Sequence, residues 1–214
     1  MEIITLTKDS LPGALFAAVQ IVKRGGVIVF PTDTIYGIGG NAELAGVAKR
    51  VIRIKARLKE KGMPILVRDV KMARKYAYID MWTEELLGQI WPGAVSVILH
   101  KKDVVPDIIS GGRDTIAIRV SAHPFMAELF RQIDFPLIGT SANRSGAAHP
   151  KSLDEFLKDL RDRNEKPDLI INAGELQDTE PSTILDVTNR KNPVILRKGV
   201  VTKSQLEELL ERPL

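Results

Sequence analysis

Apolar residues recur along the chain in two alternating patterns. In one pattern they lie three and four positions apart, which predicts amphipathic helices; in the other they form short runs of branched residues, which predict buried strands. The first helix is expected over residues 10–24, with Ser10 able to cap it and Pro12 in its first turn. Gly25-Gly26 would end it, and its inward face would consist of Leu11, Leu15, Val19 and Val22.

Further helices are expected at residues 43–54, 83–90, Pro124–Gln132, from Ser152 to about Arg161, and from Thr202 onward. The inward face of the second helix would consist of Leu44, Val47, Val51 and Ile54. Two pairs of residues have the spacing of a capping box at the start of a helix, namely Ser152 with Glu155 and Thr202 with Gln205.

Short apolar runs predict the strands, which are Val27–Phe30, Ile65–Val67, Val95–Leu99, Ile116–Val120, Pro136–Ile138, Leu169–Asn172, Thr183–Val187 and Val194–Leu196. The last three follow one another closely, which favours antiparallel neighbours and therefore a mixed sheet. We expect an α/β fold: a single domain over residues 1–214, with its core at about 10–203, around a twisted mixed parallel/antiparallel sheet with flanking helices. No additional C-terminal domain is expected.

Composition narrows the class of protein. The 214 residues are 44% hydrophobic and 27% charged, which is ordinary for a globular domain. No apolar run approaches the roughly 18 residues of a membrane span, and the N-terminus lacks a signal-peptide pattern. The absence of cysteine excludes disulfides and thiolate metal sites. We therefore expect a cytoplasmic monomer that does not associate with membranes, and the net charge of +4 gives only a mild preference for anionic partners.

The richest polar segment is residues 31–40, Pro-Thr-Asp-Thr-Ile-Tyr-Gly-Ile-Gly-Gly, directly after the predicted strand that ends at Phe30. Hydroxyls, a carboxylate and glycines in a strand-to-helix connection are what a small-molecule site needs. A plain turn is the alternative, because Pro, Asp and Gly are all turn formers.

A basic run extends from Lys49 to Lys61, with Glu60 as its single acid. It could be a solvated helix face. However, the apolar stripe fades after Ile54, which places Lys55 and Arg57 where the helix gives way to a loop, able to point at one place. A lysine point charge beside a planar arginine suits a polyphosphate.

A second polar segment, Thr140-Ser-Ala-Asn-Arg-Ser-Gly146, also follows a predicted strand. The hydroxyl of Ser141 and the amide of Asn143 could hold phosphate or ribose oxygens, or they could form a local turn that caps the next helix. Two polar loops at strand ends of one α/β sheet should lie close together, because ligands gather at such ends.

Arg119 is the most unusual charge in the chain because it lies inside the apolar run Ile116–Val120. A buried unpaired charge is costly, so Arg119 needs an anionic partner, either an internal acid or a substrate carboxylate. Ser182 and Thr183 begin one of the later strands, and Arg197 ends another.

Several common site patterns are missing. Gly37-x-Gly39-x-x-Ala42 resembles a dinucleotide-binding fingerprint. However, six residues separate it from the strand, whereas the fingerprint should follow the strand directly. There is no P-loop, and His100, His123 and His149 have no metal-ligand spacing. The main alternative to an enzyme is a protein whose basic concave face binds RNA.

Taken together, the motifs resemble the YrdC/TsaC family, the L-threonylcarbamoyladenylate synthases of the tRNA t6A pathway. The resemblance runs from about residue 10 to 203. It is carried in order by Pro31–Gly37, Lys55-Ala-Arg57, Met63–Val67, Trp91-Pro-Gly93, Ile116–Arg119, Ser141-Ala-Asn143, Pro181-Ser-Thr183 and Leu196-Arg197. Two segments depart from the family pattern: Pro92–Ser96 replaces the usual Pro-Gly-Pro-x-Thr, and Arg68 occupies a position that is often His.

This resemblance implies synthesis of threonylcarbamoyl-AMP and pyrophosphate from ATP, L-threonine and bicarbonate or CO2. The product would supply t6A37 in tRNAs that read ANN codons. It further implies Mg2+ carried by the ATP phosphates with no metal held by the protein, downstream t6A transferase machinery as a partner, and weak RNA or tRNA binding.

The resemblance also implies roles for individual residues. The characteristic set, which we expect to be catalytic, falls on Lys55, Arg57, Ser141 and Asn143. ATP would contact these four residues together with Thr115, His149 and Arg197, and L-threonine would contact Thr32, Tyr36, Arg119 and Ser182, with Arg119 on its carboxylate.

Overall fold

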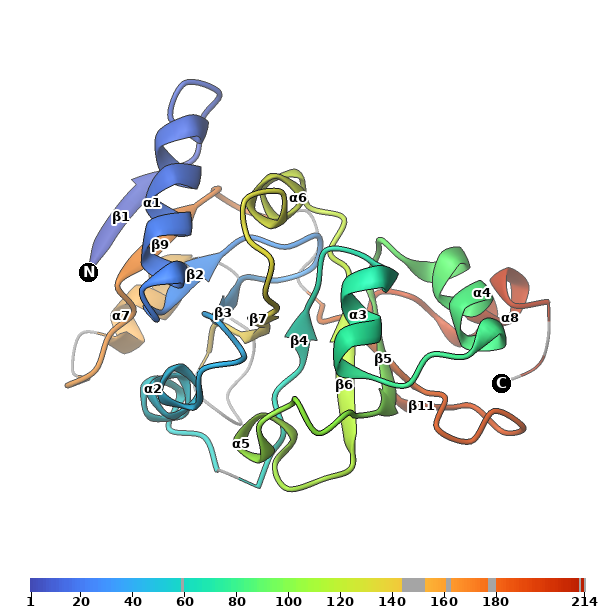
Figure 1. Cartoon of the computed structure of the whole chain (residues 1–214). Coiled ribbons are helices and arrows are strands. Elements are labelled where there is room, and N and C mark those ends of the chain that lie inside the picture. The colour runs from blue at the N-terminus through green and yellow to red at the C-terminus, as the bar shows by residue number, and fades with distance from the viewer. Residues whose placement is uncertain (59, 144–152, 161–162, 177–179, 212, 214) are drawn as a thin grey trace.

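The computed structural model describes the chain except for residues 59, 144–152, 161–162, 177–179, 212 and 214 (Figure 1). Its strands form two sheets. In spatial order, the first consists of β1 (Glu2–Thr5), β9 (Leu169–Asn172), β2 (Ile28–Phe30), β3 (Gly37–Gly39) and β8 (Thr140–Ser141). The second consists of β11 (Val194–Arg197), β10 (Thr183–Asp186), β5 (Val95–His100), β6 (Thr115–Arg119), β4 (Ile65–Leu66) and β7 (Leu137–Ile138).

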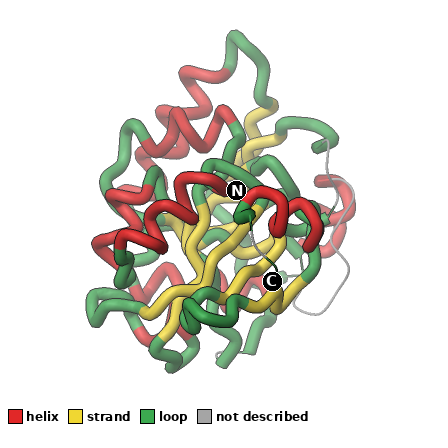
Figure 2. Tube along the Cα trace, turned by 90° about the vertical axis from the view of Figure 1, so that its right-hand side faces the viewer, coloured by secondary structure: helices red, strands yellow, loops and turns green. Residues whose placement is uncertain are grey.

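Helices surround these strands, as Figure 2 shows. They are α1 (Leu11–Lys23), α2 (Ala45–Lys55), α3 (Val70–Tyr76), α4 (Met81–Ile90), α5 (Asp107–Ser110), α6 (Pro124–Phe130), α7 (Leu153–Leu160) and α8 (Lys203–Leu209). Helix α1 packs against β2 and β9, and α3 lies against α4 (Figure 1). None of the described helices has the length and apolar character that crossing a membrane requires.

The predicted α/β class with mixed parallel and antiparallel pairing is confirmed, but the strands are divided over two sheets instead of one. β10 and β11 are antiparallel as expected, whereas β9 pairs in parallel with β1 and β2 in the other sheet. The physical reason lies in the connection between β9 and β10. Residues 173–182 form a connection long enough to reach the other sheet, where a tight hairpin would be too short.

The two sheets meet at the stretch that contains β7 and β8. β7 pairs with β4, and β8, only one residue further on, pairs with β3. The backbone of Gly39 lies so close to this stretch that a Cβ there would be 1.7 Å from the carbonyl oxygen of Ile138. Glycine is therefore required at position 39 for the sheets to join. The first polar segment and the described part of the second, residues 140–143, lie at this junction.

Most of the expected helix faces are confirmed. Helix α1 buries Leu15, Val19 and Val22, and α2 buries Val47, Val51 and Ile54. Leu44 is an exception: it precedes the first turn of α2 and is 42% exposed. The capping box of Thr202 and Gln205 is present, and that of Ser152 and Glu155 lies outside the described residues.

The expected cap at Ser10 is wrong. Its hydroxyl donates to the carbonyl of Thr5 (2.7 Å) and accepts from the amide of Thr7 (2.8 Å), so it stabilises the turn before α1 instead of the helix. Some short elements are not predicted by the sequence pattern. Two of them, β3 and β8, lie inside segments that the pattern predicts as connections, and they exist because they pair with each other.

Candidate functional site

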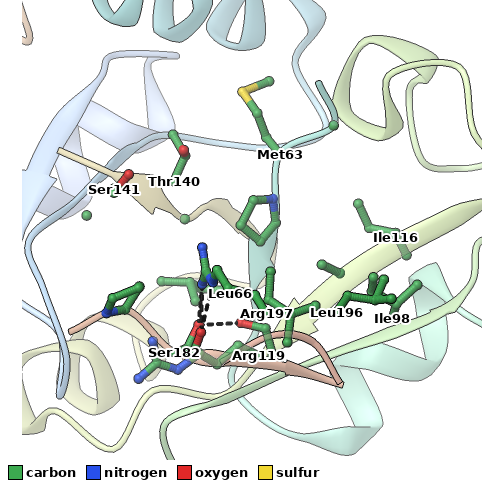
Figure 3. Close-up of a pocket in the computed structure, with 18 of the residues that line it drawn as sticks. Met63, Leu66, Ile98, Ile116, Arg119, Thr140, Ser141, Ser182, Leu196 and Arg197 are labelled. Atoms are coloured by element: carbon green, nitrogen blue, oxygen red, sulfur yellow. Dashed lines mark hydrogen bonds between the residues drawn. The ribbon is translucent and has the colours of Figure 1, made fainter. Parts of the chain in front are cut away.

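A cavity of about 580 Å³ is lined by strands of both sheets (Figure 3). Figure 3 shows Thr140 and Ser141 on one side, with Arg119, Ser182 and Arg197 on the other. A volume of this size suits a small-molecule ligand. The lining includes most of the residues predicted to bind substrates, namely Thr32, Tyr36, Arg57, Thr115, Arg119, Ser141, Ser182 and Arg197.

The two polar segments are neighbours, as expected. Gly37 pairs with Ser141 in the ladder between β3 and β8, and the amide of Ala142 donates to the carbonyl of Tyr36 (2.8 Å). Lys55 and Asn143 do not line the cavity but are buried behind its wall. His149 lies outside the described residues.

Lys55 anchors the segment 141–143 in this structure. It is the last residue of α2 and only 1% exposed. Its ammonium donates to the carbonyl oxygens of Ser141 and Asn143 and to Oδ1 of Asn143 (3.2 Å). The expectation that Lys55 and Arg57 point at one place is therefore not met, because the three donors of Lys55 face this segment. Burial lowers the pKa of Lys55 to about 7, with smaller contributions from the charges of Arg57 and Arg163.

Ser141 and Asn143 form a compact unit with Lys55. The hydroxyl of Ser141 donates to Oδ1 of Asn143 (2.6 Å), and the amide of Asn143 donates to the carbonyl of Ser141 (2.9 Å). This agrees in part with the local-turn alternative, because Asn143 serves the segment itself. Ser141 lines the cavity as well. The unit therefore presents a hydroxyl to a ligand and is fixed from behind by a buried lysine.

Arg57 points in another direction because the chain turns at Ala56. Ala56 has a left-handed conformation (φ 47°) as the C-cap of α2. The guanidinium of Arg57 donates to the carbonyl oxygens of Lys61 (3.1 Å) and Gly62 (2.8 Å) and lines the cavity. The left-handed residue thus separates the buried cation of Lys55 from the cavity-facing cation of Arg57.

Replacing Ala56 by glycine is expected to stabilise the protein by up to about 1 kcal/mol, because a left-handed conformation strains a residue that has a Cβ. Thermal unfolding of the Ala56→Gly variant measures this effect. A lower melting temperature would mean that the strain is smaller than the extra conformational entropy that glycine gives the unfolded chain.

A fourth cavity arginine was not predicted from the sequence. Arg113 lies after Gly111 and Gly112, and both glycines have positive φ, in the connection from α5 to β6. Burial lowers the pKa of Arg57, and the nearby charge of Arg113 lowers it further. Two cations that lie close together at a cavity wall repel each other, and a bound anion lowers this repulsion. In the sequence, the two glycines directly before Arg113 were the signal that could have pointed to this residue.

The opposite wall holds Ser182 and Arg197. The guanidinium of Arg197 donates to the carbonyl oxygen (2.7 Å from Nη2) and to the hydroxyl (3.2 Å) of Ser182. The Ser182 hydroxyl is also hydrogen-bonded to that of Ser96 (2.9 Å). Burial lowers the pKa of Arg197, and the charge of Arg119 lowers it further, so this wall also favours an anion.

Thr32 and Tyr36 use their hydroxyls within the protein. Thr32 donates to the carbonyl of Ile35 (2.6 Å). Tyr36 donates to the carbonyl of Gly174 (2.7 Å) and accepts from the amide of Ala173 (2.9 Å). Burial raises the pKa of Tyr36, which keeps its phenol protonated. Both residues shape the cavity wall through hydrogen bonds to loops.

Arg119 is 5% exposed and has an internal partner. Its Nε donates to the carbonyl of Gly93 (2.8 Å) and its Nη1 to the hydroxyl of Thr34 (2.8 Å). Its Nη2 lies 2.8 Å from Oδ1 of Asp33, close enough for an ion pair, but its N–H groups are not directed at the oxygen as a hydrogen bond requires. The internal-acid alternative is therefore present, and the same guanidinium lines the cavity. Asp33 was not singled out from the sequence as a partner.

Part of the basic run is neutralised within the protein. Arg50 pairs with Asp168 (2.7 Å), and Arg53 is paired with Glu165. These pairs weaken the argument that the run forms an RNA-binding face. Across the described ranges, no group of three or more His, Asp or Glu residues is arranged to hold a metal ion.

The chain is similar to known proteins over most of its length. The family model for Sua5, YciO and YrdC proteins, described as telomere recombination, matches residues 20–199. The chain is 32% identical over 194 residues to the threonylcarbamoyl-AMP synthase of Pyrococcus abyssi, covering 90% of this chain and 56% of that protein. It is 33% identical over 184 residues to the uncharacterized protein YciO of Escherichia coli K12, and the match covers 86% of this chain and 87% of that protein.

A solved structure is similar over nearly the whole chain. The crystal structure of P. abyssi Sua5 complexed with L-threonine matches with a TM-score of 0.89 and 31% identity, covering 98% of this chain and 61% of that one. The chain thus spans little more than half the length of the P. abyssi relative.

Proposed function

Because the chain belongs to the Sua5/YciO/YrdC family, we propose that it is a threonylcarbamoyl-AMP synthase that uses ATP, L-threonine and bicarbonate or CO2. The observation that carries the proposal is the concentration of four arginines, Arg57, Arg113, Arg119 and Arg197, around one cavity. A relative with the name of this activity and a similar structure complexed with L-threonine support it.

The chemistry asks the protein for positioning and charge neutralisation. The amine of L-threonine adds to CO2 and loses a proton, which gives a carbamate. A carbamate oxygen then attacks the α-phosphorus of ATP, the bond from that phosphorus to the bridging oxygen breaks, and pyrophosphate leaves. The carbamate, the triphosphate and the threonine carboxylate are all anions, so cations that hold them together lower the barrier. A cavity rich in arginine and hydroxyl groups suits this reaction without a cysteine or histidine nucleophile.

We assign Arg57, Arg113 and Arg197 to the ATP phosphates. Ser141, on the wall shared with Arg57, and Thr115 are assigned to the nucleotide. Lys55 and Asn143 fix Ser141 from behind in the free protein, and a shift of the segment 141–143 on binding would bring the Lys55 ammonium toward a phosphate. Mg2+ arrives with ATP as part of that substrate.

Beside Arg197, on the same wall of the cavity, we assign Arg119 to the carboxylate of L-threonine. Ser182, Thr32 and the ring of Tyr36 surround the same substrate. The finer consequences of the proposal are delivery of the threonylcarbamoyl group to tRNA by a separate transferase and a cytoplasmic location.

Pyrophosphate release from ATP tests the proposal directly. We expect release only when L-threonine and bicarbonate are both present, and mass spectrometry of the fresh mixture should contain threonylcarbamoyl-AMP. L-Serine serves as a matched substrate, since the missing methyl group is worth about 1–3 kcal/mol of discrimination. RNA binding without threonine-dependent pyrophosphate release would favour the binding-protein alternative, and weak RNA binding that falls steeply with salt is compatible with both.

Ser141→Ala and Asn143→Ala are each expected to weaken use of ATP. Ser141 loses a hydroxyl in the cavity, and Asn143 loses the oxygen that orients both Ser141 and Lys55. The loss of one such hydrogen bond corresponds to a roughly two- to tenfold higher KM for ATP. Steady-state kinetics with varied ATP measure it, with circular dichroism to verify the fold. Wild-type ATP kinetics in both variants would remove this segment from the site.

A further inference from the structure

The contacts of Arg119 leave one edge of its guanidinium incompletely bound. Gly93 and Thr34 accept well-directed hydrogen bonds from Nε and Nη1. Nη2 is buried and close to Asp33, yet it makes no hydrogen bond of normal geometry within the described part of the chain. An arginine and a carboxylate that close together usually form directed, often bidentate, hydrogen bonds. Something therefore holds the carboxylate of Asp33 away from the aligned position.

The hydroxyl of Ser121 accounts for this misalignment. It donates to Oδ1 of Asp33, the same oxygen that faces Arg119. The backbone amide of His123 in turn donates to Oγ of Ser121 (3.3 Å), which directs the hydroxyl toward Asp33. Ser121 is 6% exposed, so water does not replace this contact. The oxygen is thus shared between a hydroxyl and a guanidinium, and the shared charge holds Arg119 less strongly than an undivided one would.

We propose that Asp33 and Ser121 are positioning residues for Arg119. Asp33 keeps the buried guanidinium charged and oriented while the cavity is empty. Ser121 draws the carboxylate aside, so that the guanidinium, whose Nη2 is buried while the cavity is empty, can turn toward the cavity that Arg119 lines and donate to an anionic group of the substrate. This inference rests on the proposed function, in which that group is the carboxylate of L-threonine. Neither residue touches the substrate; both act through Arg119.

Ser121→Ala is the decisive variant. Without the hydroxyl, Asp33 either aligns with Arg119 and competes with the substrate carboxylate, or loses its fixed orientation. Both events weaken threonine binding. We expect the KM for L-threonine to rise about two- to tenfold, the effect of one hydrogen bond, while the KM for ATP and kcat stay within about twofold of wild type. A role confined to stability would instead lower the melting temperature and leave the KM for L-threonine unchanged.

Ser121→Thr is the matched control. It keeps the hydroxyl, and Ser121 also lines a second cavity of about 270 Å³ that has room for the added methyl group. The threonine variant is expected to restore the wild-type KM for L-threonine. If Ser121→Ala and Ser121→Thr raise this KM equally, the hydroxyl has no positioning role and the inference is wrong.

Asp33→Asn gives an independent measurement that does not depend on turnover. It removes the internal counter-charge of Arg119, so the melting temperature should fall and L-threonine should raise it more than it does in wild type. An equal ligand-induced shift in both proteins would contradict the inference. Wild-type protein without threonine-dependent pyrophosphate release would overturn the proposed function, and this inference with it, whereas an active wild type with unaffected Ser121 and Asp33 variants would overturn the inference alone.

Discussion

Replacing Arg119 by lysine is expected to raise the KM for L-threonine at least about tenfold, with little change in ATP binding measured without threonine. Lysine keeps the charge but loses the planar fork that donates to Gly93, Thr34 and the substrate at the same time. Losing a charge-assisted hydrogen bond corresponds to roughly 10–100-fold in affinity. Steady-state kinetics with varied L-threonine and direct titration with an ATP analogue separate the two effects.

The ion pair between Arg119 and Asp33 defines the alternative result, in which Arg119 has only a structural role. If Arg119 only satisfies Asp33, the substitution lowers the melting temperature and leaves the KM for L-threonine unchanged, because a partly buried carboxylate loses its guanidinium partner. Arg131→Lys is a suitable control for the exchange itself. Arg131 is exposed and pairs with the neighbouring Glu128 on α6, so neither quantity should move.

Replacing Lys55 by methionine is expected to lower kcat/KM for ATP by about 100–1,000-fold, the usual effect of removing a group that stabilises developing charge. Methionine fills a similar volume, so the buried site stays packed while the ammonium is lost. The carbonyl oxygens of Ser141 and Asn143 then lose the ammonium that donates to them. Lys49→Met, on the exposed face of the same helix, serves as the control. Normal ATP kinetics in the Lys55 variant would make this lysine purely structural.

The same lysine predicts a pH dependence. Burial lowers the pKa of Lys55 from 10.5 to about 7 in the folded protein. Between these values the unfolded chain binds the proton and the folded chain does not, so the contribution of Lys55 to stability increases as pH rises through that window. The contribution of Lys55 to phosphate binding changes in the opposite direction and decreases as pH rises. The KM for ATP should rise more steeply above about pH 7 in wild type than in Lys55→Met, because the variant keeps the titration of ATP itself but lacks that of Lys55.

Local chemistry made much of the fold and the site predictable from the sequence. The spacing of apolar residues located α1, α2, β5 and β6 to within a few residues, because those elements bury one regular face or a continuous run. Likewise, the position of Arg119 inside an apolar strand was enough to require an anionic partner. These are properties of single elements, and they do not depend on how the elements assemble.

What could not be predicted depends on long-range pairing. The division into two sheets follows from the path of residues 137–141, and a two-residue strand such as β8 has no periodicity of its own. The orientation of Lys55 depends on acceptors more than 80 residues away. Asp33 resembles any turn residue in the sequence, and only the approach of β6 turns it into the partner of Arg119.

The order of strands in the first sheet has a consequence for biosynthesis. β9 lies between β1 and β2, although it follows Phe30 by about 140 residues in the chain. At roughly 5–20 residues per second, on the order of ten seconds pass on the ribosome before the pairing partner of these two early strands is made. Until Leu169–Asn172 emerge, the apolar strand β2 has an open edge, and such edges promote aggregation. Nascent chains that stop before residue 169 should therefore depend on chaperones, and the completed chain should need them much less.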